Sequence, residues 1–119
     1  MSESSAVDRL PDAVLELDAD RRVVSANAAV TELTGLAREA IVGRPLAEAL
    51  RPRDTAGHDL CAVGWDRSTR LRSVTRIPER EVRLRGRGSR DVRALVTGRY
   101  QRDGDGHVAG AVLVLRDGA

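Results

Sequence analysis

The sequence predicts an α+β fold in which one five-stranded antiparallel sheet carries short helices on one face. Two strand-like runs come first, a set of short helical runs follows, and three further strand-like runs complete the chain. Because strands and helices do not alternate, a doubly wound parallel sheet is not supported. A length of 119 residues suits one compact domain that needs no disulfide or metal to fold.

The N-terminal residues 1–11 predict a short cap helix. Ser4 or Ser5 can cap its first turn, Val7 and Leu10 provide its apolar contacts, and Pro11 ends it. We therefore divide the chain into a cap helix over residues 1–11, a domain over 12–117, and the start of a linker at 118–119.

Two strands and a helical connector follow the cap helix. Residues 13–17 and 22–26 are each predicted to form a strand, and the polar turn between them predicts an antiparallel hairpin. From Asn27 the apolar period becomes helical and ends at Gly35, where a left-handed cap is expected. Residues 38–42 predict a second short helix, and Pro45 suits the first turn of a third.

The second half of the chain predicts a loop and then a meander. Residues 52–79 contain scattered apolar positions with glycines and prolines, which indicates loop with one irregular helical turn. Three strands are expected over residues 81–85, 91–101 and 107–116, with glycine-rich turns between them.

Composition narrows the class of protein. No apolar run is long enough to span a membrane, and the polar N-terminus does not look like a signal peptide, so we expect a cytoplasmic location. The single cysteine, Cys61, cannot form an internal disulfide. With only His58 and His107 beside it, a zinc site is not expected either.

Two motifs and the last strand resemble the PAS domain family. Residues 26–36, read as Ala-Asn-Ala-Ala-Val-Thr-Glu-Leu-Thr-Gly-Leu, are similar to that family's Asn-x-Ala helix, and residues 38–46 to its turn ending in Gly-Arg-Pro-Leu. Residues 112–117 resemble its final strand, which ends in Arg-Asp and leads into a signalling helix. The whole chain is similar to N-terminal PAS sensor domains of actinobacterial histidine kinases. The sequence differs from the family pattern at Leu36 and at Gly118-Ala119, and the resemblance is weakest across residues 52–79.

The resemblance implies a non-catalytic input module that regulates a downstream kinase or other effector domain. A ligand or partner would bias its conformation, and Arg116 and Asp117 would pass the change to the output segment. The alternative is a ligand-free dimerisation module whose interior is packed core. Five residues are the expected interior wall around a small apolar ligand, if one binds: Leu15, Leu33, Leu50, Val96 and Leu113.

The last strand is apolar on both faces, whereas a sheet with one covered side should alternate with polar residues. We expect its outer face, with Val108, Val112 and Val114, to be covered either by Val7 and Leu10 of the cap helix or by a second subunit in a homodimer.

One pair of residues could bind a cofactor. His58 and Cys61 form a His-x-x-Cys pair that could ligate haem, but a solvated histidine and a small buried thiol explain them more simply, so no cofactor is predicted.

Residues 67–99 hold eleven arginines against three acids. They lack the aromatic partners of single-strand binders, so a solvated face is favoured over specific nucleic-acid binding. No catalytic motif is present, and an enzyme is not expected.

Overall fold

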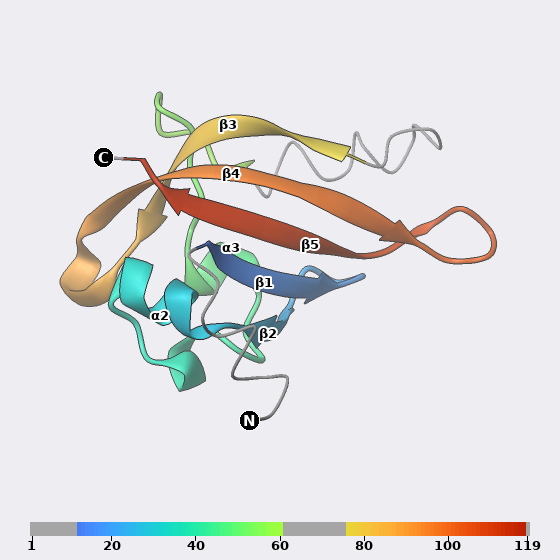
Figure 1. Cartoon of the computed structure of the whole chain (residues 1–119), viewed down its shortest axis with the longest axis horizontal. Coiled ribbons are helices and arrows are strands. Elements are labelled where there is room, and N and C mark those ends of the chain that lie inside the picture. The colour runs from blue at the N-terminus through green and yellow to red at the C-terminus, as the bar shows by residue number, and fades with distance from the viewer. Residues whose placement is uncertain (1–11, 61–75, 119) are drawn as a thin grey trace.

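The computed structural model describes residues 12–60 and 76–118, and it shows one antiparallel sheet (Figure 1). The strands are β1 (Ala13–Asp18), β2 (Val23–Ala26), β3 (Arg76–Arg85), β4 (Asp91–Arg102) and β5 (Val108–Asp117). Their order across the sheet is β2-β1-β5-β4-β3, so the last strand of the chain lies in the middle. This arrangement confirms the predicted hairpin, the predicted meander and the five-stranded antiparallel sheet.

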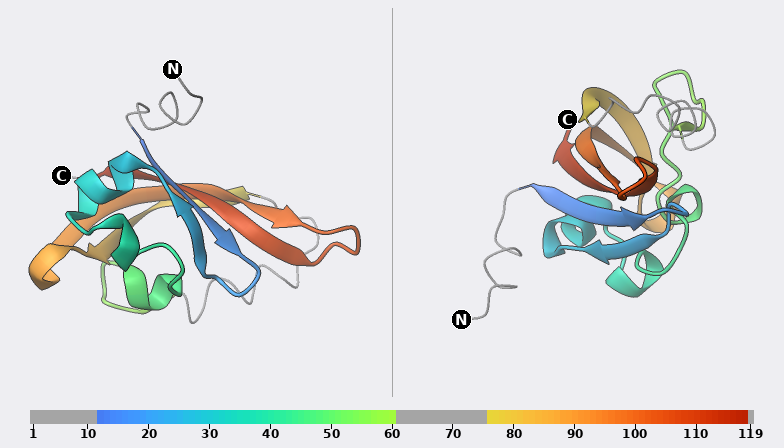
Figure 2. Two further views of the ribbon diagram at one scale, coloured as in Figure 1. Left: turned by 90° about the horizontal axis from the view of Figure 1, so that it is seen from below. Right: turned by 90° about the vertical axis from the view of Figure 1, so that its right-hand side faces the viewer.

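Short helices lie against one face of the sheet, as both views in Figure 2 show. They are α2 (Ala28–Thr34), the 3₁₀ turn η1 (Arg38–Ala40) and α3 (Leu46–Ala49). A second 3₁₀ turn, η2 (Arg87–Ser89), joins β3 to β4. In the described segments, no helix has the length and apolar character that crossing a membrane requires. The predicted cap helix over residues 1–11 lies outside the described residues.

Two elements differ from the predictions by more than one residue at a boundary. The helix expected over residues 38–42 is only one 3₁₀ turn, η1. The strand expected from residue 81 begins five residues earlier and includes Pro78, which the predictions had treated as a loop residue. Proline is tolerated there because β3 is an edge strand and its register shifts between Ile77 and Arg80, so no ladder hydrogen bond is lost.

The core fills the space between the helices and the inner face of the sheet. Every second residue of β1 is buried, as the alternation of a half-covered strand requires. The fully buried large side chains come from all layers of the domain: Leu15, Leu17, Ile41, Leu50, Leu84, Val23, Val30 and Val82. The free edge of β3 is also partly covered, because the backbones of Arg53 and Arg83 exchange two hydrogen bonds, at 2.8 and 3.0 Å.

The buried side chain of Asn27 joins α2 to the start of β1 through three hydrogen bonds. Its Oδ1 accepts hydrogen bonds from the backbone N–H of Val30 in α2, at 3.3 Å, and of Val14 in β1, at 3.0 Å. Its Nδ2 donates to the backbone oxygen of Asp12 at 3.2 Å. The predicted helix cap is therefore correct, and the same side chain also fixes α2 to the start of β1.

One turn geometry occurs three times in the described residues. In each case an aspartate Oδ1 accepts hydrogen bonds from the backbone N–H groups two and four residues later, and the third residue after it has a positive φ. The acceptors are Asp18, Asp54 and Asp103. The positive-φ positions are Arg21, Gly57 and Gly106. In each turn the aspartate side chain takes the place of a backbone acceptor, which explains why the positive-φ residue always follows it by three positions.

We expect Asn27→Ala to destabilise the domain by about 2–3 kcal/mol, because three hydrogen bonds worth roughly 1 kcal/mol each are lost. Urea unfolding followed by circular dichroism measures this. Asn27→Asp is the matched control, since it keeps the two accepted bonds and loses only the donated one, so its loss should be smaller. A loss below about 0.5 kcal/mol for the alanine variant would contradict the assigned role.

The turn at Asp103 predicts a pH dependence of stability. Hydrogen bonds from the backbone N–H groups of His107 and Asp105 hold the pKa of the Asp103 carboxyl below its ordinary value of 3.8. Since the folded pKa is lowered, this contribution is complete above about pH 5 and is lost as the pH falls through and below 3.8.

Asp103→Asn keeps an acceptor oxygen but cannot titrate. The difference in unfolding free energy between the wild type and this variant should therefore shrink between about pH 5 and pH 3. Asp105→Asn controls for the loss of one charge at the same hairpin tip. A difference that stays constant across this pH range would show that the turn does not depend on the carboxylate.

Candidate functional site

A pocket of about 510 Å³ lies between the inner face of the sheet and the segment around α3. Leucines and valines from β1, β3, β4 and β5 form one wall, and the other wall is formed by Leu46, Leu50, Pro52 and Leu60. Ligand pockets of proteins commonly measure about 300–1,000 Å³ and are mostly apolar. In size and lining this pocket can hold a small organic molecule.

Aliphatic residues make up most of the described lining of this pocket, and Tyr100 is the only aromatic residue among the described lining residues. Gly98, on the inner face of β4, pairs with Ile77 on one side and Leu113 on the other. A Cβ at Gly98 would come within 2.9 Å of Leu113 Cδ2, so no larger residue fits without a shift of its neighbours.

Few polar side chains face the pocket. Arg21 comes from the turn between β1 and β2, Glu79 and Arg80 from β3, and Tyr100 from β4. The other described lining residues are leucine, isoleucine, valine and proline. Burial of apolar surface would therefore supply most of the affinity for a ligand, and the polar groups would orient it.

Four of the five residues expected in the interior wall line this pocket: Leu15, Leu50, Val96 and Leu113. Leu33 does not. It lies on α2, which packs against β1, and it is partly buried at the margin of the core. Sequence reasoning missed Ile77, Pro78 and Leu60, because residues 52–79 were assigned to a loop. The alternation of Leu84 and Val82 does not continue to Ile77, because Arg80 takes the next inward position and the register shifts between Ile77 and Arg80, so no local pattern marked these residues.

The histidine considered as a haem ligand lies away from the pocket. The ring of His58 is 77% exposed, and its Nδ1 is 3.1 Å from Oδ2 of Asp54, within one of the three aspartate turns. His58 is not among the described lining residues. Cys61, the second residue of that pair, lies outside the described residues.

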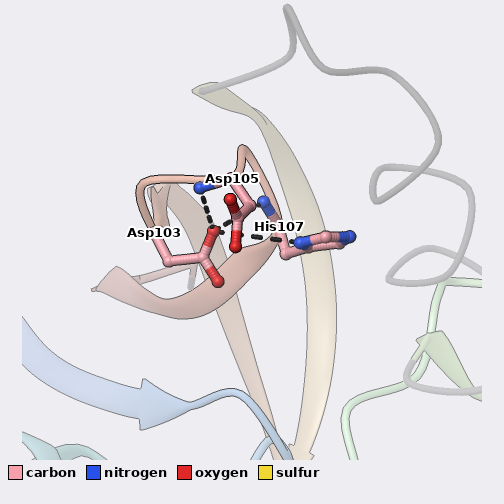
Figure 3. Close-up of side chains that lie close together, drawn as sticks. All are labelled: Asp103, Asp105 and His107. Carbon is pink, nitrogen blue, oxygen red and sulfur yellow. Dashed lines mark hydrogen bonds and ion pairs between the residues drawn. The ribbon is translucent and has the colours of Figure 1, made fainter.

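A second group of side chains that could hold a metal ion lies at the tip of the β4–β5 hairpin (Figure 3). The ligand atoms of Asp103, Asp105 and His107 are all within 4.8 Å of one another, and all three residues are exposed. Two backbone N–H groups of the same turn already donate to Asp103 Oδ1. The turn itself therefore accounts for this proximity.

Several arginines of β3 and β4 lie at outward positions of the sheet, whereas Arg80 faces the pocket. Asp91 binds Arg53, from the segment before β3, at 2.7 Å and lies 3.8 Å from Arg83. The hydrogen bond from Arg53 and its charge lower the pKa of the Asp91 carboxyl. The outward position of Arg83, Arg93 and Arg99 agrees with the alternation of the strands.

The outer side of β5 carries two of the three valines expected at an interface. Val112 and Val114 are half-buried and alternate with the buried Leu113 and Leu115. Val108 differs, because a register shift places it opposite Arg102 and interrupts the alternation. Val7 and Leu10 lie outside the described residues.

The end of β5 contacts the start of β1. Arg116 Nε lies 3.4 Å from Oδ1 of Asp12, and Gly118 continues the ladder by donating its N–H to the backbone oxygen of Arg93 at 3.0 Å. Arg116 and Asp117, the expected output residues, are both exposed.

The chain is similar to several solved PAS domains. The chain is similar to the PAS domain of a protein from Colwellia psychrerythraea, with 15% identity, coverage of 97% of this chain and 92% of that one, and a TM-score of 0.72. It is similar to the PAS domain of nitrogen regulation protein NR(II) from Vibrio parahaemolyticus, with 19% identity, 98% coverage of both chains and a TM-score of 0.70.

A third similar structure is the PAS domain, in complex with ethanol, of a LuxR-family transcriptional regulator from Burkholderia thailandensis. Identity is 17%, coverage is 98% of this chain and 97% of that one, and the TM-score is 0.72. No match was found among curated proteins. The family model described as the PAS fold matches residues 4–118. The chain therefore belongs to the PAS family.

Proposed function

We propose that this chain is a non-catalytic sensory PAS domain of a cytoplasmic signal-transduction protein, and that it is the input module of a histidine kinase. The observation that carries the proposal is the aliphatic pocket of about 510 Å³ on the inner face of the sheet. Occupation of this pocket by a small apolar ligand would stabilise one conformation over another. The protein in solution is a homodimer, and its signal goes to a kinase or another effector domain.

Two similarities support this proposal. The similar domain from Burkholderia thailandensis was solved in complex with ethanol, which is a small, largely apolar molecule. The similar domain from Vibrio parahaemolyticus belongs to a nitrogen regulation protein. A pocket wall of leucine and valine without a nucleophile or histidine among its described residues is suited to binding rather than to catalysis.

The proposed route from the pocket to the output follows β5. Leu113 and Leu115 line the pocket, and the same strand ends in Arg116 and Asp117. A shift of β5 would change the contact of Arg116 with Asp12, whose backbone oxygen is held by Asn27. The pocket, the end of β5 and the start of β1 are thus connected by direct contacts. Binding of a ligand would favour one arrangement of these contacts over another.

The ligand-free dimerisation module is the second candidate. The half-buried Val112 and Val114 favour it, because apolar residues on the outer side of a middle strand are typical of a covered face. In that case the pocket would stay empty in solution, and the next experiment separates the two functions.

Val96→Phe should fill part of the pocket and weaken the binding of 1-hexanol, used as an aliphatic probe, by about tenfold or more. Amide chemical shifts in an NMR titration measure the affinity. Native mass spectrometry of the protein purified from cells shows whether the wild type retains a small molecule that the variant has lost.

Val24→Phe is the matched control, because Val24 is 49% exposed and does not line the pocket. It should bind hexanol as the wild type does. If the wild type neither retains a molecule nor responds to hexanol, the sensory proposal fails and the ligand-free module is favoured.

Asp12→Ala should reduce the ligand-induced shifts at the amides of Arg116, Asp117 and Gly118 while hexanol affinity stays within about twofold, since exposed ion pairs contribute roughly 0–1 kcal/mol. The NMR titration reports both quantities. Glu16→Ala, a second acid on the same side of β1, is the control. Unchanged shifts at the end of β5 in Asp12→Ala would exclude this contact as the route.

A further inference from the structure

A bulge in β3 turns one charged side chain toward the pocket. The two residues between Ile77 and Arg80 lie opposite the single residue Thr97 of β4. Residues three apart in a regular strand face opposite sides of the sheet, but here the extra residue lets Ile77 and Arg80 both line the pocket. The Oγ1 of Thr97 donates a hydrogen bond to the backbone oxygen of Ile77 at 3.0 Å, which holds the bulge.

Arg80 occupies a position that otherwise belongs to the apolar wall. The next inward residue of β3 is Val82, and the residue opposite on β4 is Val96; their exposed fractions are 1% and 9%. Arg80 itself is exposed although it lines the pocket. An arginine can lay its methylene groups along such a wall and keep its charged end in water. Its guanidinium therefore lies where the pocket opens to solvent.

The charge of Arg80 is not neutralised by a neighbouring acid. Within residues 12–60 and 76–118, no carboxylate forms an ion pair with it. Arg53, by contrast, is paired with Asp91 at 2.7 Å. A charged group at an apolar wall is stabilised by a partner of opposite charge. The guanidinium of Arg80 is thus suited to contact a negatively charged ligand.

The charges around the pocket favour an anion over a cation. Two arginines and one glutamate belong to the described lining, namely Arg21, Arg80 and Glu79. Their formal charges leave one positive charge in excess. A ligand with a single negative charge balances this excess, whereas a cation increases it. Because most of the remaining lining is aliphatic, the rest of the ligand should be apolar.

We propose that the pocket binds an aliphatic monocarboxylate, with its chain against the leucine and valine wall and its carboxylate on the guanidinium of Arg80. Arginine presents a planar fork of N–H donors that matches the two oxygens of a carboxylate. An alcohol of the same chain length buries the same apolar surface but lacks this charged contact. The inference rests on the proposed function and narrows its ligand, and it makes Arg80 a residue that determines specificity.

Three probes of equal chain length separate the headgroups: hexanoate, 1-hexanol and hexylammonium. In NMR titrations of the full chain near pH 7 and at low salt, hexanoate should bind about five- to tenfold more tightly than 1-hexanol, and hexylammonium should bind most weakly. Added salt should weaken only the charged contact and therefore affect hexanoate more than 1-hexanol. If hexylammonium binds most tightly, Glu79 is the headgroup contact and the proposal is overturned.

A series of chain lengths shows whether the aliphatic part enters the pocket. All 20 basic residues of the chain are arginine, so a small carboxylate has many surface sites at which to bind weakly. From acetate through butanoate to hexanoate, affinity should rise about fourfold for each methylene that becomes buried. Affinity that does not depend on chain length would place the carboxylate on surface arginines and would contradict the proposal.

Substitution of Arg80 tests its role directly. Arg80→Gln should lower hexanoate affinity by about five- to tenfold and leave 1-hexanol affinity within about twofold, because only the carboxylate loses a contact. Arg80→Lys keeps the charge but lacks the planar fork, so its hexanoate affinity should lie between those of Arg80→Gln and the wild type.

Arg76→Gln is the matched control. It removes one positive charge from an exposed position of the same strand, and Arg76 is not among the described lining residues. Hexanoate should bind this variant as it binds the wild type. Hexanoate affinity that is unchanged in Arg80→Gln, or that falls by the same factor as 1-hexanol affinity, would overturn the assigned role of Arg80.

Failure of this inference and failure of the proposed function give different results. If 1-hexanol binds in the pocket and hexanoate binds no more tightly, the carboxylate class is wrong while the sensory function stands. If neither probe binds, the sensory function fails, and the inference fails with it.

Discussion

The side chain of Asn27 is the constraint on which the other elements depend. It is buried, it caps α2, and it holds the backbone of β1 at Asp12 and Val14. A buried amide of this kind is stable only when its donor and acceptor groups are paired, so the helix and the strand must meet in one orientation. That orientation places α2 against β1, the strand whose Leu15 and Leu17 line the pocket.

The middle strand β5 connects the two functional surfaces. Leu113 and Leu115 face the pocket, while Val112 and Val114 face outward, because successive side chains of a strand point to opposite faces. A change in the pocket therefore acts on the strand that forms the centre of the outer side of the sheet and ends in the output residues.

Much of the fold and part of the site follow from local patterns. The helix between Asn27 and Gly35 was predictable because a side-chain cap and a left-handed glycine mark its two ends. Leu33 was assigned to the pocket wall because it belongs to the apolar side of that helix, but α2 packs on β1 and leaves Leu33 at the margin of the core. The start of β3 was missed because Pro78 reads as a loop residue unless its strand is known to be an edge.

The sequence by itself determined the order of the elements, the turns and the two apolar sides of β5, because these depend on residues a few positions apart. Only the tertiary structure decided that β5 lies between β1 and β4, and that a bulge in β3 turns Arg80 toward the pocket. It also decided where the pocket forms, since that depends on packing between Leu50, Leu113 and Ile77 from distant segments. Local pattern specifies periodicity, whereas the pairing of distant strands depends on the free energy of the whole core.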